Sequence, residues 1–379
     1  MIKLKKTILI STGELSGEIY AADLARDLLQ RYPDFRLRGM GSNLLKNAGV
    51  EIVVDTKDLS LIGALAIIGK INKIWNAFKL MRQAIYQKPD LLILVDYPGF
   101  NIFLARIAKR AGVKILYYIG PKIWAWNFRR IKTIKAVVNL MAVIFPFEVD
   151  LYRSANVPVR FVGNPLLKFI TNLTYTKQQF REQAGISVHD PVVALFPGSR
   201  PGEIKRLLPV ILEATKILGT ENKTIQFILA RASSISLEYL NSYLANFSIP
   251  IKIISEQSYK IMKMADVILS ASGTATLEAI LIGTPLVIIY KISWFEYQIA
   301  KRLIKVPYVG LGNILAGKMV VPELLQNEAS PENIALILAK ILEDKQYMEQ
   351  MIAEFRQIKE SLTAVEATDL VSIVANLID

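Results

Sequence analysis

Small residues separate an expected strand from an expected helix at Ala271–Glu278, whose sequence is Ala-Ser-Gly-Thr-Ala-Thr-Leu-Glu. The run Ala265–Ser270 predicts a buried strand, and 279–283 complete a short helix that ends at a glycine. Such a turn presents unpaired backbone N–H groups at a helix N-terminus, where anions bind. Glu278, one helical turn further on, can accept hydrogen bonds from sugar hydroxyls. The segment therefore indicates a nucleoside diphosphate site with Glu278 on the ribose. The alternative is an ordinary capped helix, since Ser and Thr are common caps.

Two charged residues follow other apolar strands. Asp96 comes directly after Leu91–Val95, and Arg200 follows Val192–Phe196 in a Pro-Gly-Ser-Arg turn. The carboxyl ends of strands in parallel α/β sheets face the ligand crevice, so Asp96 is a candidate acid or base. A guanidinium binds phosphate in a bidentate way, so Arg200 is a candidate phosphate ligand. The alternatives are an Asp96 that only orients its loop and an Arg200 that lies on the surface.

A glycine-rich turn, Gly13-Glu14-Leu15-Ser16-Gly17-Glu18, follows the expected strand Thr7–Ser11 and opens an expected helix to about Leu29. It lacks the full spacing of a dinucleotide fingerprint or a P-loop. Ser16 and Gly17 are candidates to line a ligand site at this helix start. The alternative is that they only cap the helix.

Composition narrows the possible chemistry. The chain has 379 residues, no Cys and one His, so disulfides and thiolate chemistry are excluded and a zinc site is disfavoured. The net charge of +13 points to an anionic partner: nucleic acid, a phospholipid surface or a phosphorylated substrate. No apolar run reaches the roughly 18 residues of a membrane span. Met1–Lys6 leads directly into a strand and shows no cleavable signal region.

The elements that must position these residues are alternating strands and helices. Expected strands in the first half lie at 7–11, 51–55, 91–95, 114–119, 141–145 and 160–162. The alternation restarts after residue 190, with expected strands at 192–196, 225–229, 251–254, 265–270 and 286–289. This pattern predicts an α/β protein of two doubly wound, Rossmann-like domains facing across a cleft, the GT-B arrangement of glycosyltransferases. We expect domains at 1–163 and 164–345, with 346–379 forming C-terminal helices that cross back to the first domain.

One expected helix, Leu59–Ile85, has an unusual character. An apolar stripe runs along it, with Lys and Arg largely at its flanks and no acid between Ser60 and Pro89; the stripe is Ile67, Ile71, Ile74, Phe78, Met81 and Ile85. Such a stripe commonly packs on a sheet. A basic amphipathic helix with Trp and Phe can instead lie in a membrane interface.

Several stretches, in order along nearly the whole chain, together resemble the lipid-A-disaccharide synthase family. They are Gly13–Glu18; Asp96-Tyr97-Pro98-Gly99-Phe100-Asn101; Pro121-Lys122-Ile123-Trp124-Ala125-Trp126; Ile144-Phe145-Pro146-Phe147-Glu148; Phe161–Pro165; Pro197–Arg200 with Gly202-Glu203-Ile204; Ala271–Glu278; and 306–309, 313–317 and 321–324. The order of the set is more specific than any one motif. Three positions depart from the family pattern, namely Glu18, Asn164 and Tyr97-Pro98-Gly99, which puts a direct role for those residues in doubt.

The resemblance implies an inverting, metal-independent transfer. The family joins UDP-2,3-diacylglucosamine to 2,3-diacylglucosamine 1-phosphate, forms a β-1,6-linked disaccharide and releases UDP, in lipid A biosynthesis in Gram-negative bacteria. It works at the inner face of the cytoplasmic membrane and uses no cofactor, since the UDP-sugar is a substrate. The acyl chains of these substrates then explain the stripe of 59–85 better than core packing does, and we expect that helix to bind an anionic membrane surface.

Each candidate residue then has an expected role in such a transfer. We expect Asp96 to be the base for the acceptor hydroxyl, Arg200 to hold the leaving diphosphate, and Glu278 to bind the ribose. The full candidate set for UDP-sugar binding is Ser16, Gly17, Ser199, Arg200, Ser272, Gly273, Thr274, Ala275, Thr276, Glu278 and Asn313.

Other readings stay open from the residues alone. The chain could be another UDP-sugar protein of this fold, such as the lipid II glycosyltransferase or a non-hydrolysing UDP-GlcNAc epimerase. The single His, His189, disfavours the epimerase. A nucleic-acid-binding protein would fit the charge, but no recognisable module appears, so we expect no nucleic-acid partner. The sequence does not decide acyl-chain length or whether the chain forms a homodimer.

Overall fold

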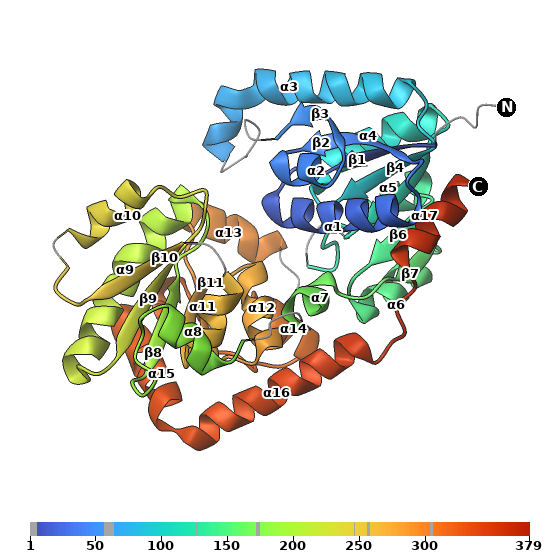
Figure 1. The fold of residues 1–379 in the computed structure, drawn as a ribbon. Helices are drawn as coiled ribbons and strands as arrows, with labels where there is room; N and C mark the ends of the chain where they lie inside the picture. The colour runs from blue at the N-terminus through green and yellow to red at the C-terminus, as the bar shows by residue number, and fades with distance from the viewer. Residues whose placement is uncertain are drawn as a thin grey trace. The chain divides into compact units, whose positions relative to one another are not determined.

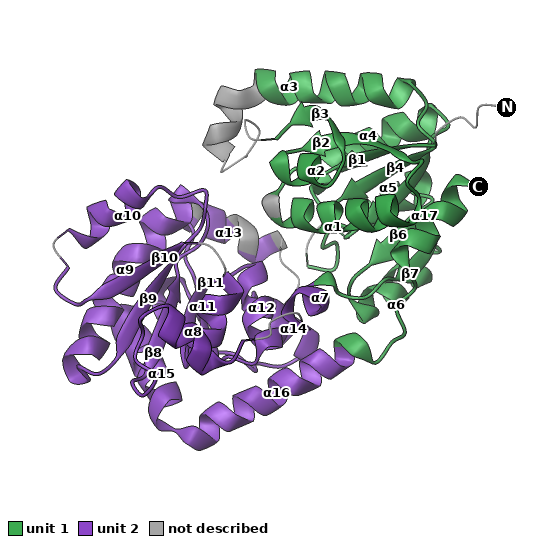
Figure 2. Ribbon diagram, in the orientation of Figure 1, with its two compact units in different colours: residues 1–165, 362–379 green, residues 166–361 purple. Residues whose placement is uncertain are grey.

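The computed structural model describes residues 6–56, 64–125, 128–171, 175–245, 247–255, 258–303 and 306–379. The chain forms two compact units, one of residues 1–165 with 362–379 and one of residues 166–361 (Figure 2). The helical tail expected as one segment from residue 346 is therefore divided between the two units.

The first unit is built on a parallel sheet with helices on both faces (Figure 1). Its strands are β1 (Thr7–Ser11), β2 (Arg36–Gly41), β3 (Glu51–Asp55), β4 (Leu91–Val95), β5 (Lys114–Tyr118), β6 (Leu140–Val143) and β7 (Val159–Phe161). Its helices are α1 (Leu15–Arg31), α2 (Asn43–Asn47), α3 (Ala64–Tyr86), α4 (Pro98–Arg110), α5 (Arg130–Val137), α6 (Pro146–Ser154) and α17 (Leu370–Ile378). Helices α1 and α17 pack against each other and over β4, while α4 lies between α3 and α5 and also packs on β4 and β5.

The second unit repeats this design. Its strands are β8 (Val192–Phe196), β9 (Gln226–Arg231), β10 (Ile251–Ser255), β11 (Val267–Ala271), β12 (Leu286–Tyr290) and β13 (Glu323–Leu325). Its helices are α7 (Pro165–Thr171), α8 (Lys177–Gln183), α9 (Pro201–Glu221), α10 (Leu237–Leu244), α11 (Ser258–Met264), α12 (Thr274–Ile282), α13 (Trp294–Leu303), α14 (Leu311–Ala316), α15 (Pro331–Glu343) and α16 (Lys345–Thr363). Helix α15 packs on α9 and over β11 and β12, and α11 and α12 pack together and on strands of the same sheet.

Continuous apolar runs explain why the central strands form. Every residue of β4, β8 and β11 is buried, as expected for parallel strands covered by helices on both faces. Gly283, with φ of +89°, ends α12 in the left-handed region that glycine adopts readily. The two Rossmann-like domains expected from the alternation of strands and helices are confirmed.

The strand order places one special position in each sheet. The first unit has the order β3-β2-β1-β4-β5-β6-β7, and the second has β10-β9-β8-β11-β12-β13. The order reverses direction between β1 and β4 in one sheet and between β8 and β11 in the other. In open α/β sheets, ligands bind outside the carboxyl ends of the strands at this switch point.

The structure corrects the interpretation of the apolar stripe on α3. Met81 and Ile85 are fully buried in the core of the first unit, and Ile74 and Phe78 pack against that core. For this half of the stripe, core packing is therefore right and contact with acyl chains is wrong. The side chains of Ile67 and Ile71 lie outside the described part of the chain.

Candidate active site

The switch point of the first unit brings the glycine-rich turn against Asp96. A β-carbon added at Gly17 would lie 3.6 Å from Cβ of Asp96 and 3.1 Å from Oγ1 of Thr12. A β-carbon at Gly13 would lie 2.2 Å from the ring of Tyr97. Both glycines therefore let the start of α1 pack directly on the turn that carries Asp96, and Ser16 lies half-buried in the same helical turn.

The backbone at Asp96 is strained. Asp96 and Tyr97 both have φ of +47°, in the left-handed region that residues other than glycine rarely adopt. Each such residue costs on the order of 1–3 kcal/mol, and residues of this kind cluster at functional sites. The strain at the end of β4 is therefore compatible with a functional role for Asp96.

The surroundings of Asp96 suit a general base. The pKa of its carboxyl is raised from 3.8 to about 6, mainly by burial and to a smaller extent by the nearby Glu14, while Lys122 and the N–H group of Tyr97 oppose the shift. A carboxylate with a pKa close to neutral is ionised at pH 7.5 and still accepts a proton more readily than an exposed one.

A second buried carboxyl lies at the carboxyl ends of β5 and β6. Glu148 accepts hydrogen bonds from Nε1 of Trp124 (3.2 Å) and from the N–H group of Phe145 (3.3 Å). Burial raises the pKa of Glu148 to about 7, and Lys122 partly offsets the shift. Glu148 ends one of the stretches that resemble the family, 144–148, but no role is predicted for it from the sequence. Its position among aromatic residues, directly after an apolar strand, is the feature of the sequence that could have indicated a functional carboxyl.

Glu18, one of the three departures from the family pattern, has a structural role. Its buried carboxylate accepts hydrogen bonds from the N–H groups of Ser42 (2.5 Å) and Leu45 (3.2 Å). It therefore holds the start of α2 and the loop after β2.

In the second unit, Arg200 stands where β8 passes into α9. The Glu203 carboxylate accepts hydrogen bonds from the N–H groups of Ser199 (3.0 Å) and Arg200 (3.3 Å), and its other oxygen lies 3.4 Å from Nη1 of Arg200. Gly198 has φ of +109°, and a β-carbon there would lie 2.3 Å from Oε2 of Glu203. The Pro-Gly-Ser-Arg turn is thus wound around Glu203, and the Arg200 side chain is 49% exposed.

The segment after β11 lies beside this turn. Strands β8 and β11 pair directly, with Phe196 opposite Ser270, so their carboxyl ends are neighbours. Helix α12 begins after Gly273 without a side-chain cap. The alternative of a helix capped by a Ser or Thr side chain is therefore wrong.

The hydrogen bonds of this segment show which of its polar groups are used within the protein. The N–H group and hydroxyl of Thr276 both donate to the carbonyl of Gly273, at 3.2 and 2.8 Å. The hydroxyl of Ser272 donates to the carbonyl of Val309 at 3.4 Å. The N–H groups of Thr274 and Ala275 have no acceptor within the helix, because they belong to its first turn.

Glu278 follows on α12 as expected, and burial raises the pKa of its carboxyl to about 7. The pKa of Tyr259 is raised by burial and, to a smaller extent, by Glu278. A half-buried carboxyl of this kind gains from hydroxyl donors when it is ionised.

Asn313 does not have the role expected from the sequence. Its side-chain nitrogen donates to the carbonyl of Val321 (2.8 Å) and to Oε1 of Glu323 (2.7 Å). Its side-chain oxygen accepts from the N–H groups of Val320 (2.7 Å) and Val321 (2.9 Å). An amide has two donors and two acceptor sites, so none is left for a diphosphate. Asn313 instead ties α14 to the segment before β13.

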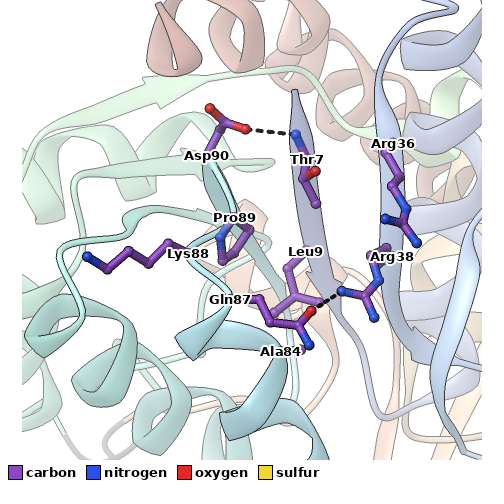
Figure 3. Close-up of a pocket in the computed structure, with 9 residues that line it drawn as sticks. All are labelled: Thr7, Leu9, Arg36, Arg38, Ala84, Gln87, Lys88, Pro89 and Asp90. Carbon is purple, nitrogen blue, oxygen red and sulfur yellow. Dashed lines mark hydrogen bonds between the residues drawn. The ribbon is translucent and has the colours of Figure 1, made fainter. Parts of the chain in front are cut away.

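A cavity of about 350 Å³ in the first unit lies at the opposite edge of the sheet (Figure 3). It is lined at the amino ends of β1 and β2 by Thr7, Arg36 and Arg38, and Arg36 and Arg38 both pair with Glu51. Asp96 lies at the other end of the strands, so this cavity is separate from the candidate active site.

Among the described residues, no cluster of three or more His, Cys, Asp or Glu side chains could hold a metal ion. Within the same residues, no helix combines the length and the apolar character needed to cross a membrane.

Solved structures with the same architecture show the fold class of this protein. UDP-GlcNAc 2-epimerase from Neisseria meningitidis, solved with UDP-GlcNAc bound, superposes with a TM-score of 0.64 at 14% identity, covering 98% of this chain and 100% of that one. MurG from Acinetobacter baumannii superposes with a TM-score of 0.57 at 17% identity, covering 98% of this chain and 99% of that one. The fold is GT-B, shared by glycosyltransferases and UDP-sugar epimerases.

Sequence relatives narrow the class to one family. A sequence model described as lipid-A-disaccharide synthetase matches residues 8–375. The lipid-A-disaccharide synthase of Trichlorobacter lovleyi is 44% identical over 358 residues, covering 94% of this chain and 93% of the relative. Lipid-A-disaccharide synthase 1 of Legionella pneumophila is 40% identical over 362 residues, covering 95% and 94%. The chain belongs to the lipid-A-disaccharide synthase family and is a glycosyltransferase of lipid A disaccharide formation.

Proposed function

We propose that the first unit binds the acceptor, 2,3-diacylglucosamine 1-phosphate, and the second binds UDP-2,3-diacylglucosamine. The 6-hydroxyl oxygen of the acceptor attacks the anomeric carbon of the donor. The bond from that carbon to the β-phosphate oxygen breaks, UDP leaves with the electron pair, and the hydroxyl proton passes to a carboxylate. One in-line displacement inverts the anomeric configuration and gives the β-1,6 linkage.

Asp96 is the proposed base. Its position at the β1/β4 switch point, its strained backbone and its raised pKa support this role. General-base catalysis by a positioned carboxylate contributes about 10²–10⁴-fold to the rate. Ser16 and Gly17 border the same position and are proposed to line the bound sugar.

Arg200 is proposed to hold the diphosphate as charge develops on it. The side chain stands at the β8/β11 switch point, and the N–H groups of Thr274 and Ala275 open toward the same edge of the sheet. Donors aimed at the charge of a leaving group commonly contribute several kcal/mol to transition-state stabilisation. Ser199, Ser272, Gly273 and Thr276 shape the two turns, and Asn313 is left out of this set because its amide is fully used.

Glu278 is proposed to accept hydrogen bonds from the ribose hydroxyls. It lies one turn into the helix whose start faces the phosphates, the spacing expected for a nucleoside held along α12. Because burial raises its pKa to about 7, binding of two hydroxyl donors would favour the ionised form and release a proton near neutral pH.

The outer face of α3 is proposed to contact the inner leaflet of the cytoplasmic membrane. Trp75, Lys79, Arg82 and Tyr86 recur at helical spacing on one face and are exposed, Trp75 by 71% and Tyr86 by 56%. Aromatic and basic side chains on one helix face are typical of interfacial helices. Each basic residue near an anionic leaflet contributes about 1 kcal/mol. This exposed face, rather than Met81 and Ile85, which are buried in the core, is the proposed peripheral membrane-binding surface.

The observation that carries the proposal is that the predicted catalytic and phosphate-binding residues lie at the two switch points of two separate sheets. The decisive experiment is mass analysis of the product formed from diacylated UDP-glucosamine and the diacylated monosaccharide 1-phosphate. We expect a disaccharide 1-phosphate and UDP, formed about 10²–10⁴-fold more slowly by Asp96→Asn. Conversion of plain UDP-GlcNAc to its epimer, with no disaccharide, would contradict the proposal and favour the epimerase reading.

A further inference from the structure

We propose that Tyr117 and Asn101 are positioning residues for the transfer reaction, because they hold the left-handed turn that aims the carboxylate of Asp96. This inference rests on the role proposed above for Asp96, and both residues would act on the substrates only through it.

The backbone of Asp96 is held on both sides. Its N–H group donates to the carbonyl oxygens of Ile119 (3.1 Å) and Tyr118 (3.4 Å). Its own carbonyl accepts from the Tyr117 hydroxyl (2.9 Å) and from Nδ2 of Asn101 (2.7 Å). The residue that carries the carboxylate is therefore tied to the end of β5 and to the first turn of α4.

The two side-chain donors are built into the core. Tyr117 and Asn101 are both fully buried. Burial raises the pKa of Tyr117 well above its ordinary value, as does the neighbouring Asp96 to a smaller extent, so its hydroxyl keeps its proton and remains a donor.

The amide of Asn101 is oriented by a further contact. Its side-chain oxygen accepts from Oγ of Ser11 at 2.7 Å, and its nitrogen lies 3.3 and 3.4 Å from the carbonyl oxygens of Val95 and Ser11. A buried amide is costly unless it is hydrogen-bonded, and here its partners are the ends of β1 and β4 on either side of the switch point. Asn101 thus links both central strands to the turn at Asp96.

The strained turn explains why such a clamp matters. Asp96 and Tyr97 have φ of +47°, and Ile119, whose carbonyl holds the Asp96 N–H group, has φ of +56°. Branched and bulky residues adopt this region only when their surroundings enforce it. Loss of a clamp lets the backbone relax toward common φ values and turns the carboxylate away from the acceptor. A displacement of about 1 Å at a reacting group can lower a rate by about 10²-fold.

The test compares two tyrosines that are neighbours in β5. Tyr117→Phe removes one hydroxyl and keeps the buried ring. Tyr118→Phe is the matched control, because its side chain is also buried while its backbone carbonyl, the atom near Asp96, is unchanged. In the purified full-length protein we expect Tyr117→Phe to lower kcat by about 10- to 100-fold, with KM for both substrates and UDP affinity within about twofold of wild type. Tyr118→Phe should keep kcat.

A double-mutant cycle separates positioning from general damage. Added to Asp96→Asn, Tyr117→Phe should change the residual rate by less than about twofold, since its route to the reaction is already gone. Two outcomes would overturn the positioning role alone. One is an equal loss of kcat on adding Tyr117→Phe to wild type and to Asp96→Asn. The other is a wild-type kcat in Tyr117→Phe when Asp96→Asn has lost most of its activity. Wild-type turnover in Asp96→Asn would instead remove the proposed base.

Ser11→Ala provides a second variant in case Tyr117→Phe does not fold. It removes the hydroxyl that orients Asn101 and should lower kcat in the same direction, again without a change in KM. A wild-type kcat in a folded Ser11→Ala protein would then overturn the proposal.

Discussion

Asp96→Asn is expected to stabilise the protein while it removes most of its turnover. The folded protein holds an ionised carboxylate in a buried, strained turn beside Glu14. Asn has nearly the same shape and carries no charge. Removing the charge should therefore relieve a cost that the active enzyme carries for its chemistry.

The magnitude follows from the pKa shift. Burial moves the pKa of Asp96 from 3.8 in the unfolded chain to about 6 in the folded protein. A shift of about two units corresponds to about 3 kcal/mol, taken as an upper bound. Below pH 3.8 the carboxyl is protonated in both states and costs nothing. Between 3.8 and 6 only the unfolded chain releases the proton, so stability falls as the pH rises, and above 6 the cost is constant.

The assay is the difference in stability between Asp96→Asn and wild type as a function of pH. We expect this difference to be about 0.5 kcal/mol at pH 4 and to reach about 2–3 kcal/mol above pH 7. In thermal melts this corresponds to a rise in Tm of about 5–10 °C for a unit of this size. Asp150→Asn is the matched control, because that side chain is 86% exposed in the same unit. It should leave stability unchanged at every pH.

Turnover is measured on the same samples. Asp96→Asn should lose about 10²–10⁴-fold in kcat, and wild-type kcat/KM should rise with pH through about 6 as the base ionises. A stability difference independent of pH would refute the buried-carboxylate account. Near-normal turnover in Asp96→Asn would refute the catalytic role whatever the stability data show.

Four other changes test the remaining assignments. Arg200→Lys should lower kcat by about 10²-fold because a point charge cannot replace bidentate contact with the diphosphate; wild-type kinetics would count against direct contact. Wild-type UDP affinity should weaken as the pH falls below about 7, where Glu278 becomes protonated, and Glu278→Gln should bind UDP weakly at every pH; calorimetry at pH 6 and 8 tests both. Trp75→Ala should weaken binding to anionic vesicles in sedimentation assays, whereas the control Trp294→Ala, at a side chain 74% exposed in the second unit, should not. Asn313→Ala should cost about 2–4 kcal/mol of stability in urea melts by leaving buried groups unpaired, and a folded Asn313→Ala protein with much weaker UDP affinity would restore its ligand role.

Strands could be predicted from the sequence wherever their whole length is buried. Leu91–Val95 and Val192–Phe196 are continuous apolar runs, and the strands β4 and β8 begin and end at the predicted residues. The prediction for 141–145 extends too far, because β6 ends at Val143. Ile144 and Phe145 are apolar and buried, but the N–H group of Phe145 already pairs with Glu148 at the start of α6. An apolar run does not show where the chain leaves a sheet when the next segment is buried too.

Two interpretations failed because they depend on contacts that no local sequence pattern shows. The stripe on α3 is compatible with a sheet or a membrane, and only the position of Met81 and Ile85 in the core distinguishes the two. Asn313 looks like a ligand residue in a glycine-flanked segment. Its amide is instead used by residues seven to ten positions later, after the chain turns back on itself.

The switch points explain why turns that are distant in the sequence could be predicted to lie close together. In a sheet whose order reverses between its first and fourth strands, the loops after those two strands are neighbours. The turn 13–17 therefore packs against Asp96 and Tyr97, and the turn 197–200 and the segment 272–276 follow two paired strands, although each pair is far apart along the chain. In a doubly wound sheet, turns that are far apart in the sequence therefore lie side by side at the switch point, where ligands commonly bind.

The geometry of Asp96 could not be predicted in the same way, because it breaks local rules. Left-handed φ values at Asp96, Tyr97 and Ile119 occur with no glycine in place, so no turn pattern indicates them. Such conformations persist only when partners elsewhere enforce them, here Tyr117 and Asn101. Local preference and tertiary structure disagree most often where function requires a specific geometry. The proposed positioning residues therefore have no signal in the sequence, whereas Asp96, the proposed base, is marked by its place directly after a buried apolar strand.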